Sequence, residues 1–179
     1  MSGDLAGAIV FTDIVGFTEI TDLHGDEFAL ELLALQDRAV SQALPEHARL
    51  VKEIGDGLLL WFDNAREAVE TSLCLQDSFG TMTPDGIPLW VRIGVHWGSP
   101  KRRGDDIVGR DVNLASRIAD LAGPGEVLCS GDVFDAVRAD SAPVDIIFEP
   151  LGPVFVRGIA EPVTLMRVER APQLLGDSA

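Results

Sequence analysis

Residues 11–18 read Phe-Thr-Asp-Ile-Val-Gly-Phe-Thr and join the end of a short apolar run to the turn that follows it. The run, residues 6–12, is rich in apolar and β-branched types and predicts a buried strand. Asp13 then stands at the end of that strand, and residues 14–18 lead towards a helix. Backbone N–H groups at such a turn bind anions, and Gly16 would let a phosphate approach the main chain. A plain strand-to-helix loop would have a similar sequence.

The rest of the chain alternates between strand and helix patterns. Residues 49–54 and 57–62 are apolar strands, and the Gly-Asp-Gly sequence at residues 55–57 between them predicts a hairpin. A helix over 25–44 precedes the hairpin and ends at Pro45. After the hairpin we expect a helix at 64–79, a strand at 88–97, a polar basic loop at 98–110 and a helix at 111–122. A strand at 126–130, a short helix at 131–139, and strands at 145–149 and 153–168 would complete the fold.

This order predicts an α+β protein with a ferredoxin-like βαββαβ core and C-terminal additions. Residues 1–170 would form one domain, and residues 171–179 a flexible tail. In that topology the first two strands are parallel, with the third between them and helices on one face. The end of the first strand then lies beside the hairpin turn, which would bring Asp13 next to Asp56.

Composition limits the possible partners. The chain has 179 residues, 46% hydrophobic, with a net charge of −15. Such an acidic chain does not favour nucleic acid, and a polyanionic substrate would need metal ions and local Arg or Lys. No apolar run reaches the ~18–20 residues of a membrane span, so we expect a cytoplasmic protein, or a soluble module of a longer one, without membrane insertion. Cys74 and Cys129 lie in apolar runs and are expected to be reduced core thiols.

Several polar residues are candidates for chemistry. Asp13 and Asp56 on one sheet edge could hold two hard cations, although Asp is also common at strand ends and turns. Asn113 and Arg117 are four residues apart and share a helix face, where Arg117 could stabilise phosphoryl charge or simply lie at the surface. Lys52 falls in a strand whose other residues indicate burial. It is therefore either a functional residue or a lysine at a solvent-facing position of the strand.

Three segments carry a resemblance: residues 11–18, residues 52–56 (Lys-Glu-Ile-Gly-Asp) and residues 106–117 (Asp-Ile-Val-Gly-Arg-Asp-Val-Asn-Leu-Ala-Ser-Arg). In this order and spacing they resemble the catalytic domain of class III adenylate and guanylate cyclases. The resemblance covers roughly residues 6–169. It implies that Asp13 and Asp56 bind two Mg²⁺ or Mn²⁺ ions, together with the carbonyl of Ile14. Phe17 and Thr18, in the turn that follows, would contact the substrate.

The resemblance also assigns the nucleotide contacts. Lys52 and Asp106 would read the purine, and this pair is typical of adenine selection. Asn113 would orient the ribose and Arg117 would stabilise the transition state, while Arg92 and Arg157 would contact the triphosphate. The implied reaction converts ATP to 3′,5′-cyclic AMP and pyrophosphate, as the ribose 3′-OH attacks the α-phosphorus in line.

The resemblance further implies a head-to-tail homodimer with two shared sites, in which a monomer is inactive. The stretch from Gly98 to Asp105 is shorter than the dimerisation arm of many members, as in a bacterial subclass. Two alternatives remain: a guanylate cyclase, and a catalytically silent domain that binds nucleotide and regulates a partner. A palm-type polymerase would share the sheet and paired carboxylates without explaining residues 106–117.

Overall fold

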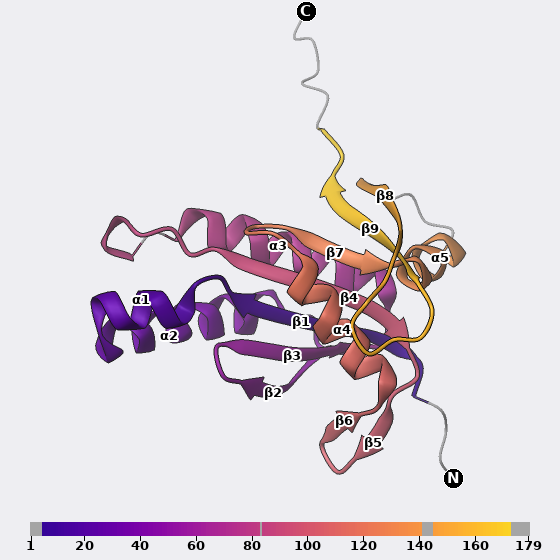
Figure 1. The fold of residues 1–179 in the computed structure, drawn as a ribbon, viewed down its shortest axis with the longest axis horizontal. Helices are drawn as coiled ribbons and strands as arrows, with labels where there is room; N and C mark the ends of the chain where they lie inside the picture. Colours follow the sequence, from indigo (N-terminus) through magenta and orange to yellow (C-terminus); the bar gives the residue numbers. More distant parts are fainter. Residues whose placement is uncertain (1–4, 83, 141–144, 173–179) are drawn as a thin grey trace, which may run out of the picture.

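The computed structural model describes residues 5–82, 84–140 and 145–172. A mixed sheet forms the centre, with helices packed on it (Figure 1). Its strands are β1 (Gly7–Ile14), β2 (Arg49–Ile54), β3 (Gly57–Phe62), β4 (Val91–Gly98), β7 (Val127–Ser130), β8 (Ile146–Val154) and β9 (Val163–Arg170). The helices are α1 (Phe17–His24), α2 (Asp26–Ala43), α3 (Ala65–Thr81), α4 (Arg110–Leu121) and α5 (Gly131–Ala139), with a 3₁₀ turn η1 (Pro84–Gly86).

The strand order is β2-β3-β1-β4-β7-β9-β8, which confirms the expected position of β3 between β1 and β2. β1 pairs antiparallel with β3 on one side and with β4 on the other. In this register Asp13 lies opposite Arg92, and Thr12 lies opposite both Leu58 and Ile93. The end of β1 therefore meets the start of β4 and the hairpin between β2 and β3.

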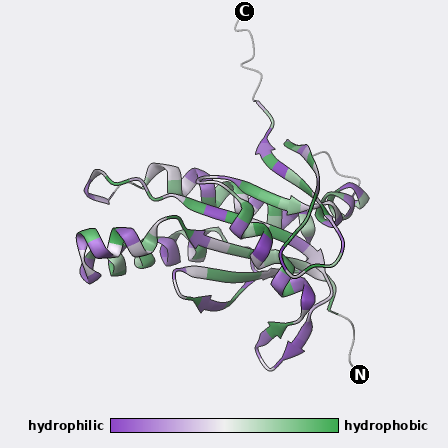
Figure 2. Ribbon diagram, viewed as in Figure 1, coloured by the Kyte–Doolittle hydropathy of each residue, from purple (hydrophilic) through white to green (hydrophobic). Residues whose placement is uncertain are grey.

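Both faces of the sheet are covered. On one face α2, α3 and α5 pack on alternate strand residues that include Val10, Leu60 and Ile93. On the other face α4 packs on Ile9 and Leu59. Burial on both sides explains why β1 and β3 are apolar at nearly every position, as Figure 2 shows in green. The expectation of helices on one face holds for α2 and α3, whereas α4 lies on the opposite face.

Four local expectations were wrong. The loop at 98–110 contains a hairpin, β5 (Lys101–Arg103) and β6 (Asp106–Val108), whose turn uses Gly104 at φ +62°. A separate helix, α1, precedes α2, and Gly25 at φ +88° divides them. The last two strands were expected at 145–149 and 153–168. In the structure β8 continues to Val154 and β9 begins at Val163, so residues 155–162 connect them. Cys74 is exposed on α3, whereas Cys129 is buried as expected and its burial raises the thiol pKa to about 12.

Residues 173–179 of the expected tail lie outside the described residues. Within the described ranges, no helix combines the length and apolar character needed to cross a membrane.

The packing of α4 depends on Gly94 in β4. A Cβ at this position would lie 2.2 Å from the backbone nitrogen of Ala119, so the helix and the strand are in direct backbone contact. This contact fixes the height of α4 above the sheet, and with it the place of Arg117 and Asp120.

We therefore expect Gly94→Ala to lower the free energy of unfolding by at least about 2 kcal/mol, because overpacking forces the backbone to shift. Urea denaturation measures the change. The matched control is Gly80→Ala in α3, where an added Cβ meets nothing within 4 Å and should raise stability by up to about 1 kcal/mol. A Gly94→Ala midpoint equal to that of the unsubstituted protein would contradict this account of the packing.

Candidate active site

Asp13 and Asp56 lie side by side at one end of the sheet. Asp13 is near the end of β1, and Asp56 occupies the two-residue turn between β2 and β3. Gly55 adopts φ +62° in that turn, a conformation that favours glycine. At Gly57 a Cβ would lie 2.6 Å from the Thr12 carbonyl oxygen, so only glycine allows the hairpin to approach β1 this closely.

The proximity of the two carboxylates has an electrostatic consequence. Burial raises the pKa of Asp56 above its ordinary value of 3.8, and the negative charge of Asp13 raises it further. Hydrogen bonds from the backbone N–H groups of Asp56 and Ile14 oppose this shift. The carboxylate pair is therefore repulsive by itself and would be stabilised by positive charge.

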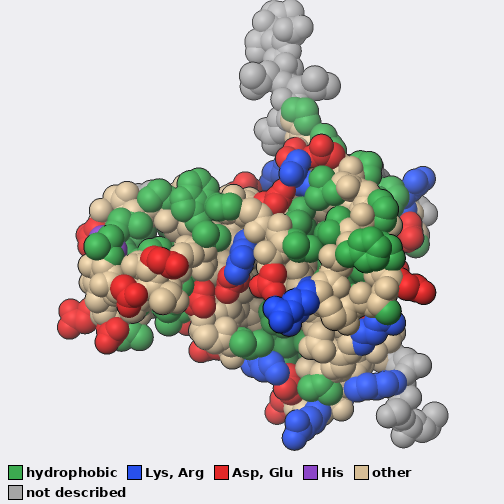
Figure 3. All heavy atoms as spheres, viewed as in Figure 1, with side chains coloured by type: hydrophobic (Ala, Val, Ile, Leu, Met, Phe, Trp, Pro, Cys, Tyr) green, Lys and Arg blue, Asp and Glu red, His purple; other side chains and the backbone are tan. Residues whose placement is uncertain are grey.

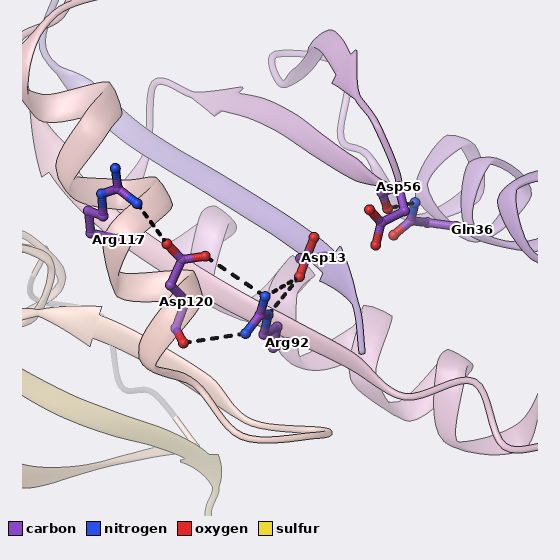
Figure 4. A network of polar contacts seen from close by, with 6 residues as sticks. All are labelled: Asp13, Gln36, Asp56, Arg92, Arg117 and Asp120. Carbon is purple, nitrogen blue, oxygen red and sulfur yellow. Dashed lines mark hydrogen bonds and ion pairs between the residues drawn. The ribbon is translucent and has the colours of Figure 1, made fainter. Parts of the chain in front are cut away.

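Arg92 supplies positive charge to Asp13. Its Nη2 lies 2.6 Å and its Nε 2.7 Å from Asp13 Oδ2. The same guanidinium reaches Asp120 of α4, with Nη2 3.8 Å from Oδ1 and Nη1 3.4 Å from the backbone oxygen. Asp120 Oδ2 in turn accepts a hydrogen bond of 3.2 Å from Arg117 Nη1. Figure 4 shows this chain, which connects Arg117 to Asp13 through Asp120 and Arg92.

Sequence analysis missed Asp120, although its spacing of three residues from Arg117 on a helix was a usable signal. It also missed Gln36 of α2, whose side chain points at Asp56 in Figure 4. Gln36 is the polar residue that interrupts the apolar stripe of α2, at a position where helical spacing requires burial.

Lys52 and Asp106 form a second group. Lys52 Nζ lies 2.7 Å from Asp106 Oδ2, and Asp106 Oδ1 accepts a hydrogen bond from the N–H of Ile107. The hydrogen bond from Lys52 is the main reason that the pKa of Asp106 is lowered. Arg49 Nη1 also donates to the Asp105 carbonyl at 2.7 Å, which ties β2 to the β5–β6 hairpin. Two segments 54 residues apart are thus brought together.

The turn after β1 leads directly into α1. Gly16 adopts a left-handed conformation, φ +70° and ψ +24°, and precedes α1 without a side-chain cap. The first N–H groups of α1 are therefore available to a ligand. Ile14 is buried, Phe17 packs on the core, and Thr18 is exposed.

The remaining predicted residues are further apart. Asn113 and Arg117 are both exposed on α4, while their neighbours Leu114, Ala115 and Ile118 on the same helix are buried. Arg157 is exposed in the segment between β8 and β9, next to Val156, which packs against α4. One chain thus places the carboxylates with Arg92, and Lys52 with Asp106, but presents Asn113, Arg117 and Arg157 to solvent.

The cavity beside Asp13 is small. It measures about 100 Å³ and lies between β1, the β2–β3 hairpin and α4. A pocket of about 530 Å³ lies elsewhere, around His96, Asp111 and Asp132, and contains none of the predicted site residues. The cavity at Asp13 is therefore smaller than the roughly 300–1,000 Å³ of a typical small-molecule site.

Surface charge is unevenly distributed (Figure 3). Acidic side chains gather over α1 and the start of α2, including Glu19, Asp22, Asp26 and Glu27, and basic side chains gather over the β5–β6 hairpin, including Lys101, Arg102 and Arg103. The hairpin that carries Asp106 is thus a basic region on an acidic protein.

The carboxylate pair fits a divalent metal. No cluster of three or more His, Cys, Asp or Glu side chains suited to a metal ion occurs in the described ranges. Mg²⁺, however, is commonly held by one or two carboxylates plus substrate phosphates, so two all-oxygen side chains are a sufficient protein contribution. Burial and the negative charge of Asp13 raise the pKa of Asp56, and a bound cation would offset the second of these causes.

Comparison with known proteins gives consistent results. A family model for the adenylate and guanylate cyclase catalytic domain matches residues 6–168. The adenylate cyclase of Streptomyces griseus is 35% identical over 135 residues, covering 74% of this chain and 33% of that protein. The adenylyl cyclase CyaB from P. aeruginosa superposes with a TM-score of 0.77 at 23% identity, covering 96% of this chain and 97% of that one. The guanylate cyclase domain of RhGC from Catenaria anguillulae, in complex with GTP, gives 0.78 at 21% identity, covering 94% and 98%.

The chain spans about a third of the length of the Streptomyces relatives that it matches. Both solved structures share its fold, one an adenylyl and the other a guanylate cyclase. The match of the family model over nearly the whole described chain decides the assignment: this chain belongs to the family of adenylate and guanylate cyclase catalytic domains.

Proposed function

We propose that the protein is an adenylate cyclase that converts ATP to 3′,5′-cyclic AMP and pyrophosphate. The Lys52–Asp106 ion pair, at 2.7 Å, is the observation that carries the choice of purine. Adenine presents an amino donor at position 6, which a carboxylate such as Asp106 accepts, whereas guanine presents an oxygen there that the carboxylate would repel. Lys52, a donor only, complements an unprotonated ring nitrogen of adenine.

Asp13 and Asp56, with the Ile14 carbonyl, would hold two Mg²⁺ or Mn²⁺ ions. When bound, these ions would supply the charge that lowers the pKa of the ribose 3′-OH and stabilises the pyrophosphate leaving group. Arg92, now paired with Asp13, would exchange that carboxylate for the triphosphate. Arg157 is a further candidate for a triphosphate contact, and the N–H groups after Gly16 would receive phosphate oxygens.

We further propose that the site is shared across a homodimer. Asn113 and Arg117 are exposed on α4, and Arg117 does not contact Asp13 directly. The cavity at Asp13 also measures only about 100 Å³. Both observations support a partner subunit that supplies Asn113 to orient the ribose and Arg117 to stabilise the charge on the α-phosphoryl group. Each dimer would then contain two complete sites.

The carboxylate pair should cost stability in the absence of metal. Asp56 has a raised pKa, so between 3.8 and that raised value the folded protein binds more protons than the unfolded chain, and stability falls as pH rises through this window. We expect Asp56→Asn to raise the free energy of unfolding at pH 7 in EDTA, and the gain to vanish below pH 3.8, where Asp56 is protonated in both states. Urea denaturation across pH tests this.

The control for that experiment is Glu53→Gln, which removes the same formal charge from an exposed position in the adjacent strand. Equal effects from both variants would mean that overall charge, and not the pairing with Asp13, determines stability.

Purine selection is tested by the double substitution Lys52→Glu with Asp106→Gly. The ratio of kcat/KM for GTP over ATP should rise by about ten- to a hundredfold, because a pair of base contacts discriminates by roughly 1–3 kcal/mol. Arg102→Glu, an exposed charge reversal in the same hairpin, should leave the ratio unchanged. A double variant that still prefers ATP would refute the purine assignment.

The shared site is tested by mixing two inactive variants, Asp56→Asn and Arg117→Ala. Each alone should lose most turnover, and Arg117→Ala should still bind ATP. An equimolar mixture should recover about a quarter of the unsubstituted activity, because half of the randomly formed dimers are mixed and each mixed dimer has one intact site. Cyclic AMP formation from ATP with Mn²⁺ is the assay. No recovery in mixtures shown by native mass spectrometry to contain mixed dimers would exclude a shared site.

A further inference from the structure

Gln36 is a buried amide in the otherwise apolar face of α2. Its side chain is 1% exposed and shares that face with Leu32, Ala39 and Val40. A primary amide in this position costs free energy unless its polar atoms are hydrogen-bonded. The location of its partners therefore indicates what the residue does.

Both partners belong to the segments that carry the paired carboxylates. Gln36 Nε2 donates to the Asp56 carbonyl oxygen at 3.0 Å, and Thr12 Oγ1 donates to Gln36 Oε1 at 3.2 Å. Thr12 Oγ1 also accepts a hydrogen bond of 3.3 Å from the N–H of Leu58, just after the hairpin turn. One side chain on the covering helix thus joins the end of β1 to the turn of the β2–β3 hairpin.

The hairpin turn needs such a connection. Asp56 lies in the two-residue turn between Ile54 and Gly57, so its carbonyl is outside the strand ladder. Its carboxylate faces that of Asp13, and the repulsion between the two charges favours movement of the turn away from β1. The amide of Gln36 opposes that movement through the backbone of Asp56, without consuming a carboxylate oxygen.

We propose that Gln36 is a positioning residue that holds the Asp56 turn against β1, and so sets the affinity of the Asp13–Asp56 pair for divalent metal. The inference rests on the proposed metal-binding role of the two carboxylates. A buried hydrogen bond that orients a ligand-bearing group commonly affects metal affinity by about ten- to a hundredfold.

The chain offers a matched control in Gln76 of α3. Its Nε2 also bridges two backbone carbonyls of the sheet, Val91 at 2.9 Å and Glu126 at 3.2 Å, but it has no contact with Asp13 or Asp56. Gln36→Met and Gln76→Met therefore remove the same kind of bond from two helices, and only the first lies at the carboxylate pair.

The experiment measures Mn²⁺ binding by electron paramagnetic resonance on the full chain without nucleotide, beside the Mn²⁺ concentration for half-maximal cyclase activity. All variants carry Gly80→Ala as a stabilising background, and urea curves verify that they fold. Gln36→Met should weaken Mn²⁺ binding by at least about tenfold. Gln76→Met should retain the parent affinity, and Asp56→Asn should abolish the bound signal.

Equal Mn²⁺ affinity in Gln36→Met and the parent would overturn the proposal. So would an equal loss in both Met variants, which would indicate general loosening, or a parent signal that survives Asp56→Asn. Because binding is measured without turnover, a parent protein that binds Mn²⁺ at Asp56 but forms no cyclic nucleotide would refute the proposed function and leave the role of Gln36 intact.

Discussion

The repulsion between Asp13 and Asp56 is the constraint around which this end of the sheet is organised. β1 is paired on both sides, by β3 and β4, so Asp13 cannot move away. The glycines of the hairpin turn permit the close approach, and Gln36 bonds the turn to the helix behind it. The fold thus places two like charges side by side, an arrangement suited to the divalent cations proposed above.

The arginines near this pair are held by weaker interactions. Arg92 and Arg117 both form ion pairs with Asp120, and all three side chains are partly exposed. Solvent therefore screens each ion pair, which contributes little to the free energy of unfolding. Such pairs exchange readily when a better anion arrives. On a chain with a net charge of −15, the proposed triphosphate substrate would be attracted only by local cations. Arg92 is such a cation beside Asp13, whereas Arg117 of the same chain is exposed and is linked to Arg92 through Asp120.

The elements that sequence analysis found are those with a strong local pattern, and those it missed are set by neighbours. The continuous apolar runs of β1 and β3 and the Gly-Asp-Gly turn are local signals. The β5–β6 hairpin, Lys101–Arg103 with Asp106–Val108, has no apolar alternation and exists because it docks beside α4 and β2. Cys74 falls in an apolar run yet is exposed. Which residues of a helix are buried depends on the face that packs against the sheet, and Cys74 lies on the opposite face of α3.

The sequence by itself determined the family and predicted the order of the first three core strands and the candidate metal- and purine-binding residues, because these follow from residue types at short, fixed spacings. Only the tertiary structure decided which charges meet. The link from Arg92 to Asp13 spans 79 residues, and that from Gln36 to Asp56 spans 20. Such contacts depend on strand register and on the height of α4 above the sheet, and both are set by packing between distant segments, which no local pattern encodes.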